Sequence, residues 1–309
     1  MTIHFSQRGN RWDSLLFPIE DNRFELTLQF RIRLVRIEPT TQYNDTNTYA
    51  KGDGNLQYAD GHRTIKLEPW NDLEWEMYKR EFKNVLERNW GERFVLTANK
   101  AWYTPRPGSA PVNPIIKCSL AIQVVDFVDQ QPHFMFRCIH FHPASYPDHF
   151  RSYASTYYGL GLITHEDVKI VWGPQRTVNP NGIIFGQIPV IHEFGHILGF
   201  DHINGDGNDE SAYGVTIDQQ NNVMGMGYSF ADKQAEPWER AMNRHLVREN
   251  RYDQSVKFTG HVDGPQITAY WDDNWVSASD PAPASVPIDD AVQGLAGVTW
   301  KHMTNLPNR

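Results

Sequence analysis

The stretch IHEFGHILGFDHI, residues 191–203, constrains this chain more than any other, because three histidines and a glutamate interrupt an apolar run. His192 and His196 are four residues apart, so on a helix they project from the same face, one turn apart. Gly199 predicts the end of that helix, because glycine tolerates the sharply turned backbone found there. Such a turn brings His202 back toward the first two imidazoles. The spacing therefore predicts a helix, a reversal of the chain and a cluster of imidazoles.

Three imidazole nitrogens in one place are a ligand set for a metal ion, and one Zn²⁺ ion suits it best. With His192, His196 and His202 bound, the fourth tetrahedral position stays open, as in catalytic rather than structural zinc sites. A water molecule there becomes acidic enough to yield hydroxide near neutral pH. Glu193 follows the first ligand and is the expected general base, taking the proton and passing it to a departing amine. The alternative, a structural histidine cluster, would bury three imidazoles without a partner, which is costly.

The motif HEFGHILGFDH resembles the zinc signature of the metzincin metallopeptidases, HExxHxxGxxH, and its wording is closest to matrixin-like members. Metzincins also carry a methionine in a tight turn beneath the zinc, and NNVMGMGYS at 221–229 matches that position. By this resemblance Met224 is the Met-turn residue, with Met226 as the alternative. In astacin-like and serralysin-like members, a tyrosine two residues after the methionine touches the zinc or stabilises the oxyanion. Tyr228 has that spacing, and so that transition-state role, only if Met226 is the key methionine.

The resemblance covers about residues 185–250 and departs from the best-known subfamilies at one position. Ile203 follows the third histidine, where matrixins usually have Ser and astacins Glu, so the subfamily stays open. No cysteine-switch motif is present, so no thiol-based latency is expected. The resemblance implies a zinc-dependent endopeptidase that hydrolyses peptide bonds of protein or peptide substrates.

The resemblance also implies an α/β (α+β) catalytic domain, with a twisted mixed sheet, an active-site helix above the cleft and a small Met-turn subdomain below it. Residues 1–200 are the expected N-terminal subdomain and 201–252 the C-terminal one. Residues 253–309 are expected to form a β-hairpin, a Pro-rich linker and a tail. Substrate is expected to bind extended beside an edge strand, for which 133–142 and 153–163 are candidates.

Hydrophobic periodicity predicts the remaining elements. FELTLQFRIRLVRI at 24–37 alternates apolar and polar residues and predicts a strand, whereas the polar, Gly/Asn/Asp-rich segment 40–62 predicts a long loop. A helix is expected at about 236–249, and further strands at 93–103, 115–128, 133–142 and 168–172.

Another amphipathic helix is expected from about Pro69 to Trp90, because proline suits a first helical turn and Gly91 can end it. The tryptophans of this segment are expected in the core. The expected apolar face consists of Leu73, Met77, Phe82, Val85 and Leu86.

The composition excludes several classes of protein. The 309 residues carry a net charge of −8, so nothing favours nucleic acid as a partner. No run of about eighteen apolar residues occurs, so no membrane span is expected. The start, MTIHFSQRGNRWDSLLF, lacks a basic segment followed by an apolar one, so no signal peptide is expected. The protein is cytosolic, is exported by a signal-independent route, or is represented by a shortened sequence, and the localisation stays open. Cys118 and Cys138 lie in strand-like runs that do not set them opposite each other, so buried free thiols are expected.

Three weaker signals concern metals. The loop 201–210 offers oxygen ligands for Ca²⁺, but it lacks the spacing of an EF-hand, so a solvated loop is favoured. Glu210 is the nearest carboxylate that could replace His202 as the third ligand. His140 and His142 would share one face of a strand and could hold a second metal, but ordinary strand histidines are favoured.

Two other functions remain open from the sequence. The chain could be a zinc-binding module without catalysis, used for adhesion or for binding a partner, although such a module has no need of Glu193. It could also be a protease that acts as an exported toxin or effector, which requires the same chemistry.

Overall fold

The strand β3 (Arg23–Ile37) organises the fold, because three neighbours pair with it along its length. Its first half lies between β2, which is antiparallel to it, and β9, which is parallel. Its second half pairs in parallel with β10. The structure, a computed structural model, describes residues 5–7, 11–20, 22–45, 48–58, 64–126, 131–141, 152–172, 183–205, 207, 210–248, 253–264 and 270–272.

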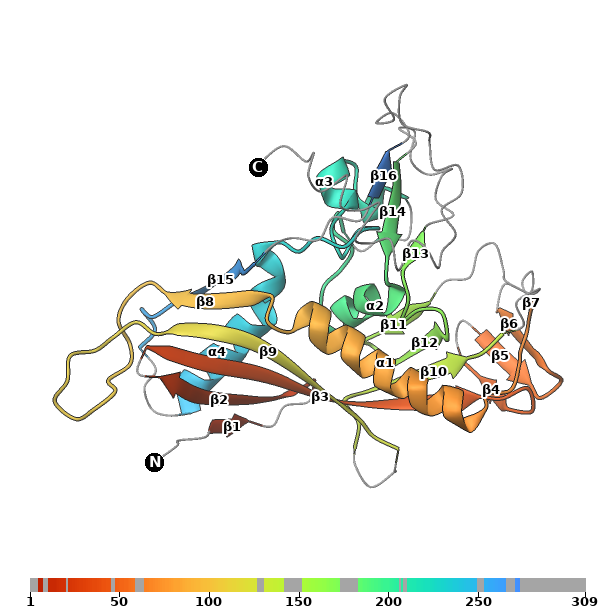
Figure 1. The fold of residues 1–309 in the computed structure, drawn as a ribbon, viewed down its shortest axis with the longest axis horizontal. Helices are drawn as coiled ribbons and strands as arrows, with labels where there is room; N and C mark the ends of the chain where they lie inside the picture. The colour runs from red at the N-terminus through yellow and green to blue at the C-terminus, as the bar shows by residue number, and fades with distance from the viewer. Residues whose placement is uncertain are drawn as a thin grey trace.

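The main sheet is mixed and follows the order β11-β12-β10-β3-β9-β8-β15, with β2 paired to β3 and β1 to β2 (Figure 1). Its strands β12, β10, β3 and β9 are mutually parallel, whereas β11 runs antiparallel to β12 at one end. The other strands of this sheet are β1 (Phe5–Gln7), β2 (Asp13–Glu20), β8 (Phe94–Ala98), β9 (Ile115–Val124), β10 (Phe134–Ile139), β11 (Tyr153–Ser155), β12 (Leu160–Thr164) and β15 (Phe258–Val262).

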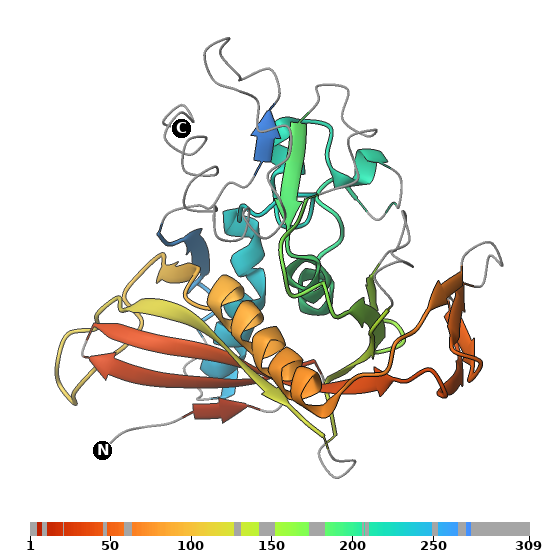
Figure 2. The same cartoon turned by 45° about the vertical axis from the view of Figure 1, so that its right-hand side comes forward.

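Three helices, α1 (Asp72–Trp90), α2 (Pro189–Leu198) and α4 (Glu236–Arg248), cover one face of this sheet (Figure 2). The even-numbered side chains of β3 from 24 to 34 are buried and point toward them. Ring contacts join the two layers: Phe30 with Phe194, Phe82 with Phe136, and Phe94 with Trp238. The core therefore lies between the sheet and the helices.

Segment 40–62 is not a long loop, so that prediction was wrong. It supplies most of a four-stranded antiparallel sheet of β4 (Gln42–Asn44), β5 (Thr48–Lys51), β6 (Asn55–Tyr58) and β7 (Thr64–Lys66). Leu56 and Ile65 are fully buried in a second core with Ile139 and Leu162 of the main sheet. The strands are too short to produce a periodic pattern, and their Gly/Asn/Asp turns dominate the composition.

The other expected elements agree with the structure in part. The strand at 24–37 and the helix at 236–249 are confirmed, and a described strand lies within each of the four shorter strand predictions. The hairpin expected after 253 is wrong, because β15 pairs with β8, whereas β16 (Tyr270–Asp272) pairs with β14 (Ile183–Gln187). The strand β13 (Val171–Trp172) completes a small sheet with β14. The linker and tail from 280 lie outside the described residues.

Helix α1 begins later than expected, after the N-cap Asn71, whose side chain accepts from Glu74 N–H while the Glu74 carboxylate accepts from Asn71 N–H. Its buried face contains Trp75, Tyr78, Phe82, Val85, Leu86, Asn89 and Trp90. Leu73 and Met77 lie on the opposite side and are 71% and 51% exposed. Their assignment to the buried apolar face was wrong, because Trp75 and Tyr78 define that face.

Both cysteines are buried free thiols, as expected. Cys118 lies on β9 beside Leu26, and Cys138 lies on β10 beside Arg36, so β3 separates them. The expected α/β class is confirmed as a mixed α/β fold with a multistranded mixed sheet and few helices. In the described part of the chain, no helix is both long and apolar enough to cross a membrane.

Candidate metal centre

Helix α2 carries the first two histidines and ends where the sequence predicts. It begins at Pro189 and ends at Leu198, with Gly199 as a C-cap in the left-handed region at φ 102°. The Gly199 and Phe200 N–H groups donate to the carbonyls of His196 (2.9 Å) and Gly195 (3.1 Å). These bonds satisfy the last turn of the helix, and the chain then reverses toward His202.

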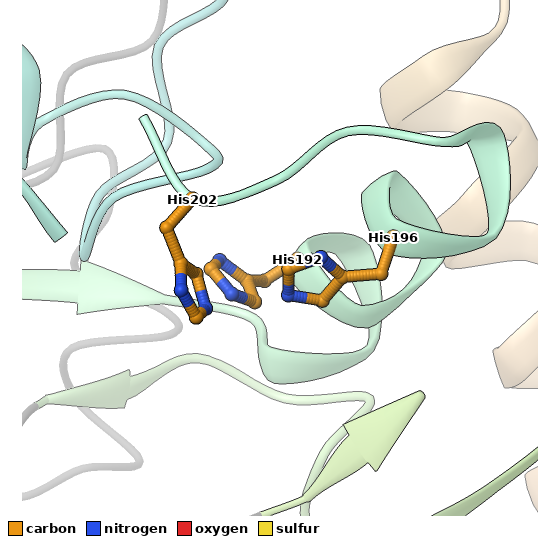
Figure 3. A group of neighbouring side chains, drawn as sticks. All are labelled: His192, His196 and His202. Carbon is orange, nitrogen blue, oxygen red and sulfur yellow. The ribbon is translucent and has the colours of Figure 1, made fainter. Parts of the chain in front are cut away.

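The reversal brings His192, His196 and His202 together (Figure 3). Their ring centroids are 4.8 to 5.3 Å apart, and one candidate ligand atom from each lies within 4.8 Å of the others. His192 is buried, and the other two rings are partly buried. The cluster predicted from the spacing is confirmed, and it could hold a metal ion.

Each of the three rings is oriented by a backbone carbonyl at its Nδ1 atom. His192 Nδ1 donates to Val223 O at 2.8 Å. His196 Nδ1 donates to Phe200 O at 2.7 Å, and His202 Nδ1 to Gly207 O at 2.6 Å. A carbonyl oxygen only accepts, so each Nδ1 carries a hydrogen, and Nε2 is the nitrogen through which the neutral imidazole binds a metal. The three residues therefore fit a metal ion in tautomer as well as in position.

Gln187, the last residue of β14, contacts both His192 and the segment 221–229. Its Nε2 donates to Gly225 O at 3.1 Å and lies 3.1 Å from His192 Nδ1. The small sheet is thereby tied to the turn that accepts the His192 hydrogen bond. Sequence reasoning missed Gln187, because no pattern links a strand end to a turn so far along the chain.

The segment 221–229 forms a compact turn against helix α2. Met224 N–H donates to Asn222 Oδ1 at 2.9 Å, and Met224 O accepts from Ile203 N–H at 2.9 Å. The Met224 side chain is buried directly against Gly195: a Cβ atom on that glycine would lie 2.2 Å from Met224 Sδ. Met226 is buried as well, at 4% exposure. The turn thus contacts both the helix of the first two histidines and the residue after the third.

Tyr228 and Tyr213 are placed differently with respect to the cluster. The Tyr228 hydroxyl donates to Asn89 Oδ1 of α1, and burial raises the pKa of Tyr228 to about 12. The ring that packs on the histidines belongs to Tyr213, 4.1 Å from the His202 centroid. Tyr213 ends the 3₁₀ helix Glu210–Tyr213. Sequence reasoning missed Tyr213, because the polar, Gly/Asn/Asp-rich segment around it carries no periodic pattern.

Glu193 lies on α2 immediately after His192, and its side chain is buried, with 7% of it exposed. A helix places successive residues about 100° apart, so Glu193 flanks the face that carries the two histidines. A buried carboxylate beside a metal site is suited to proton transfer.

The weaker metal signals receive no support from the described residues. Asp206, Asn208 and Asp209 lie outside them, as do His142 and the side chain of Glu210. Asn204 uses its amide to donate to Ser211 O. His140 packs on the ring of His165 at 4.2 Å. Within the described part of the chain, the histidine cluster is the only group of three such ligands.

Compared with models of protein families, with curated proteins and with solved structures, the chain matches none of them.

Proposed function

We propose that this protein is a zinc-dependent endopeptidase of the metzincin type, which hydrolyses peptide bonds within protein or peptide substrates. The observation that carries the proposal is the convergence of His192, His196 and His202 with every Nδ1 bonded to a carbonyl. Three imidazoles that turn Nδ1 toward a carbonyl and can bind a metal through Nε2 are the ligand set of a catalytic zinc site with one open position.

The residues around the open coordination position have separate roles in the proposed reaction. When bound, a Zn²⁺ ion supplies Lewis acidity, which polarises the scissile carbonyl and makes a water molecule acidic. Glu193 accepts a proton from the attacking water and delivers it to the leaving amine. Because Glu193 is buried, little bulk water competes for that proton or screens its charge.

Met224 is the Met-turn residue in this proposal. Its contact with Gly195, between His192 and His196 on the helix, supports that assignment over Met226. Ile203 N–H bonds to Met224 O, so the same turn also supports the third ligand. A transition-state role for Tyr228 was expected only with Met226 as the key methionine, so it is not part of this proposal, and the Tyr228 hydroxyl donates to Asn89 instead.

The edge strand β11 is the proposed docking site for the substrate backbone. Of the two candidate runs, 133–142 became the internal strand β10, whereas 153–163 contains β11 at the end of the main sheet. Strand β11 lies against α2, close to the proposed zinc ligands. An extended peptide pairs with such an edge through backbone hydrogen bonds, which bind without strong sequence preference.

The deciding experiment compares the zinc-loaded protein with Glu193→Ala on a pool of denatured proteins, with fragments quantified by mass spectrometry. We expect the variant to bind Zn²⁺ fully and to lose roughly 10²–10⁴ in cleavage rate, the usual contribution of a general base. Glu166→Ala is a matched control, because Glu166 also follows a histidine but lies outside the cluster. If wild type and Glu193→Ala are equally inert while both bind Zn²⁺, the protein is a binding module and not a peptidase.

The ligand assignment has its own test. Alanine at His192, His196 or His202 should each lower the zinc content measured by atomic emission. If His202→Ala keeps the zinc content and the activity of wild type, His202 is not the third ligand.

A further inference from the structure

The imidazole of His202, the proposed third ligand, is not held in place by a helix as those of His192 and His196 are. His192 and His196 are held by the backbone of α2, whereas His202 lies beyond the helix in an irregular loop. Its Nδ1 atom donates to Gly207 O at 2.6 Å, a bond that fixes the position of one ring atom. Packing against another ring acts on the plane of the imidazole as a whole.

A closed loop brings an aromatic ring to that place. Asn204 N–H donates to Ala212 O at 3.0 Å, and Asn204 Nδ2 donates to Ser211 O at 3.0 Å. These two bonds fasten the residues after His202 to the residues before Tyr213. Because Ile203 is also bonded to Met224, the base of the loop is fixed to the turn under the helix.

The ring of Tyr213 packs on two of the three ligands. It lies 4.1 Å from His202 at an interplanar angle of 36°, and 5.8 Å from His192 at 19°. The rings of His192 and His202 are themselves nearly parallel, at 27°. Two of these ring pairs are stacked and the pair Tyr213–His202 is tilted. Ring packing of this kind limits how far each imidazole can tilt.

We propose that Tyr213 is a positioning residue of the metal centre, whose aromatic ring fixes the plane of His202 and thereby the direction of its Nε2 lone pair. The proposal rests on the three-histidine metal site of the proposed function. The proposal assigns this role to the ring, because the ring packs on both histidines. Residues that orient metal ligands typically contribute about 10–100-fold to metal affinity.

The test measures Zn²⁺ affinity of the full metal-free chain by competition with a chromogenic chelator. Tyr213→Phe keeps the ring and should bind within about twofold of wild type, whereas Tyr213→Leu should bind about tenfold or more weakly. Tyr158→Leu is the control, because Tyr158 is 57% exposed and should leave affinity unchanged. Among the Co²⁺-loaded proteins, wild type, Tyr213→Phe and Tyr158→Leu should have the same ligand-field spectrum, and only Tyr213→Leu should have an altered one.

Several outcomes would overturn the proposal. Wild-type affinity in Tyr213→Leu would show that the ring does not position His202, and equal losses in Tyr213→Phe and Tyr213→Leu would assign the effect to the hydroxyl. Circular dichroism of the metal-free variants checks folding, and Tyr213→Met, which keeps apolar volume without a ring, replaces Tyr213→Leu under the same criterion if the latter unfolds. If the wild-type chain binds Zn²⁺ but cleaves no substrate, the proposed peptidase function is wrong, whereas the positioning role of Tyr213 is unaffected. If the wild-type chain binds no Zn²⁺, both proposals are wrong.

Discussion

Gly195 of helix α2 lies directly against Met224 of the turn 221–229, which supports the histidine cluster. A Cβ atom there would lie 2.2 Å from Met224 Sδ and 3.3 Å from a carbon of Trp90. Both distances are shorter than ordinary van der Waals contact. The position between the two helical histidines therefore has to be glycine for Met224 to lie where it does.

The variant Gly195→Ala should lower the free energy of unfolding by about 1–3 kcal/mol, the usual cost of overpacking a core. Met224→Ala makes room for the new methyl group, so the double variant Gly195→Ala/Met224→Ala should be more stable than the sum of the two single effects. Urea denaturation of the metal-free proteins measures all three values.

The same comparison of single and double variants shows which of Met224 and Met226 packs against Gly195. Gly195→Ala combined with Met226→Ala should be additive within about 0.5 kcal/mol, as for sites that share no contact. Coupling to Met226 and additivity with Met224 would reverse the assignment of the Met-turn residue.

At the scale of the element, periodicity predicted best where an element is long. Helix α2, its end at Gly199 and the convergence of His192, His196 and His202 follow from spacing alone, because a helix fixes the angle between residues. The strands of 40–62 could not be predicted, since three or four residues carry almost no period. Tyr213 and Gln187 were missed because they reach the centre through tertiary contacts between distant segments.

Helix α1 provides the test at this scale, because its buried face differs from the expected one. Phe82→Ala should cost about 3–5 kcal/mol, since the ring is fully buried against Phe136. Met77→Ala, at a position that is 51% exposed, should change stability by less than about 0.5 kcal/mol. Thermal and urea unfolding measure both, and a large loss in Met77→Ala would contradict the packing of α1 described above.

At the scale of the whole molecule, helix α4 joins parts of the chain that are far apart in sequence. Trp238 Nε1 donates to Ser119 O of β9 at 2.9 Å, and Arg240 donates to Leu198 O at the end of α2. His245 Nε2 lies 3.0 Å from Ser14 Oγ of β2 and is 1% exposed. Such pairings between the two ends of a fold have no local signature, so the sequence could predict α4 but not where it packs.

The burial of His245 predicts a pH dependence of stability. Burial, together with Arg244 and Arg248, lowers the pKa of His245 from 6.5 to about 4. Below pH 6.5, His245 is protonated in the unfolded chain but stays neutral in the folded chain. The free energy of unfolding is therefore highest above pH 6.5 and falls as the pH drops toward 4. The loss between pH 7.5 and pH 5 should be roughly 2 kcal/mol.

Urea unfolding of metal-free wild type and His245→Gln at the two pH values isolates this contribution. The variant should lose roughly 2 kcal/mol less than wild type on acidification. Equal losses in wild type and His245→Gln would mean that His245 is protonated in the folded chain.

The three carbonyls that orient the histidines belong to residues 200, 207 and 223, which come together only when the chain is folded. An ion that requires all three rings thus binds the folded chain far more tightly than the unfolded one. By thermodynamic linkage, each tenfold rise in free Zn²⁺ above the dissociation constant then adds about 1.4 kcal/mol to the free energy of unfolding. If the proposed zinc site is correct, the lifetime of the folded protein would accordingly follow the zinc concentration of its surroundings.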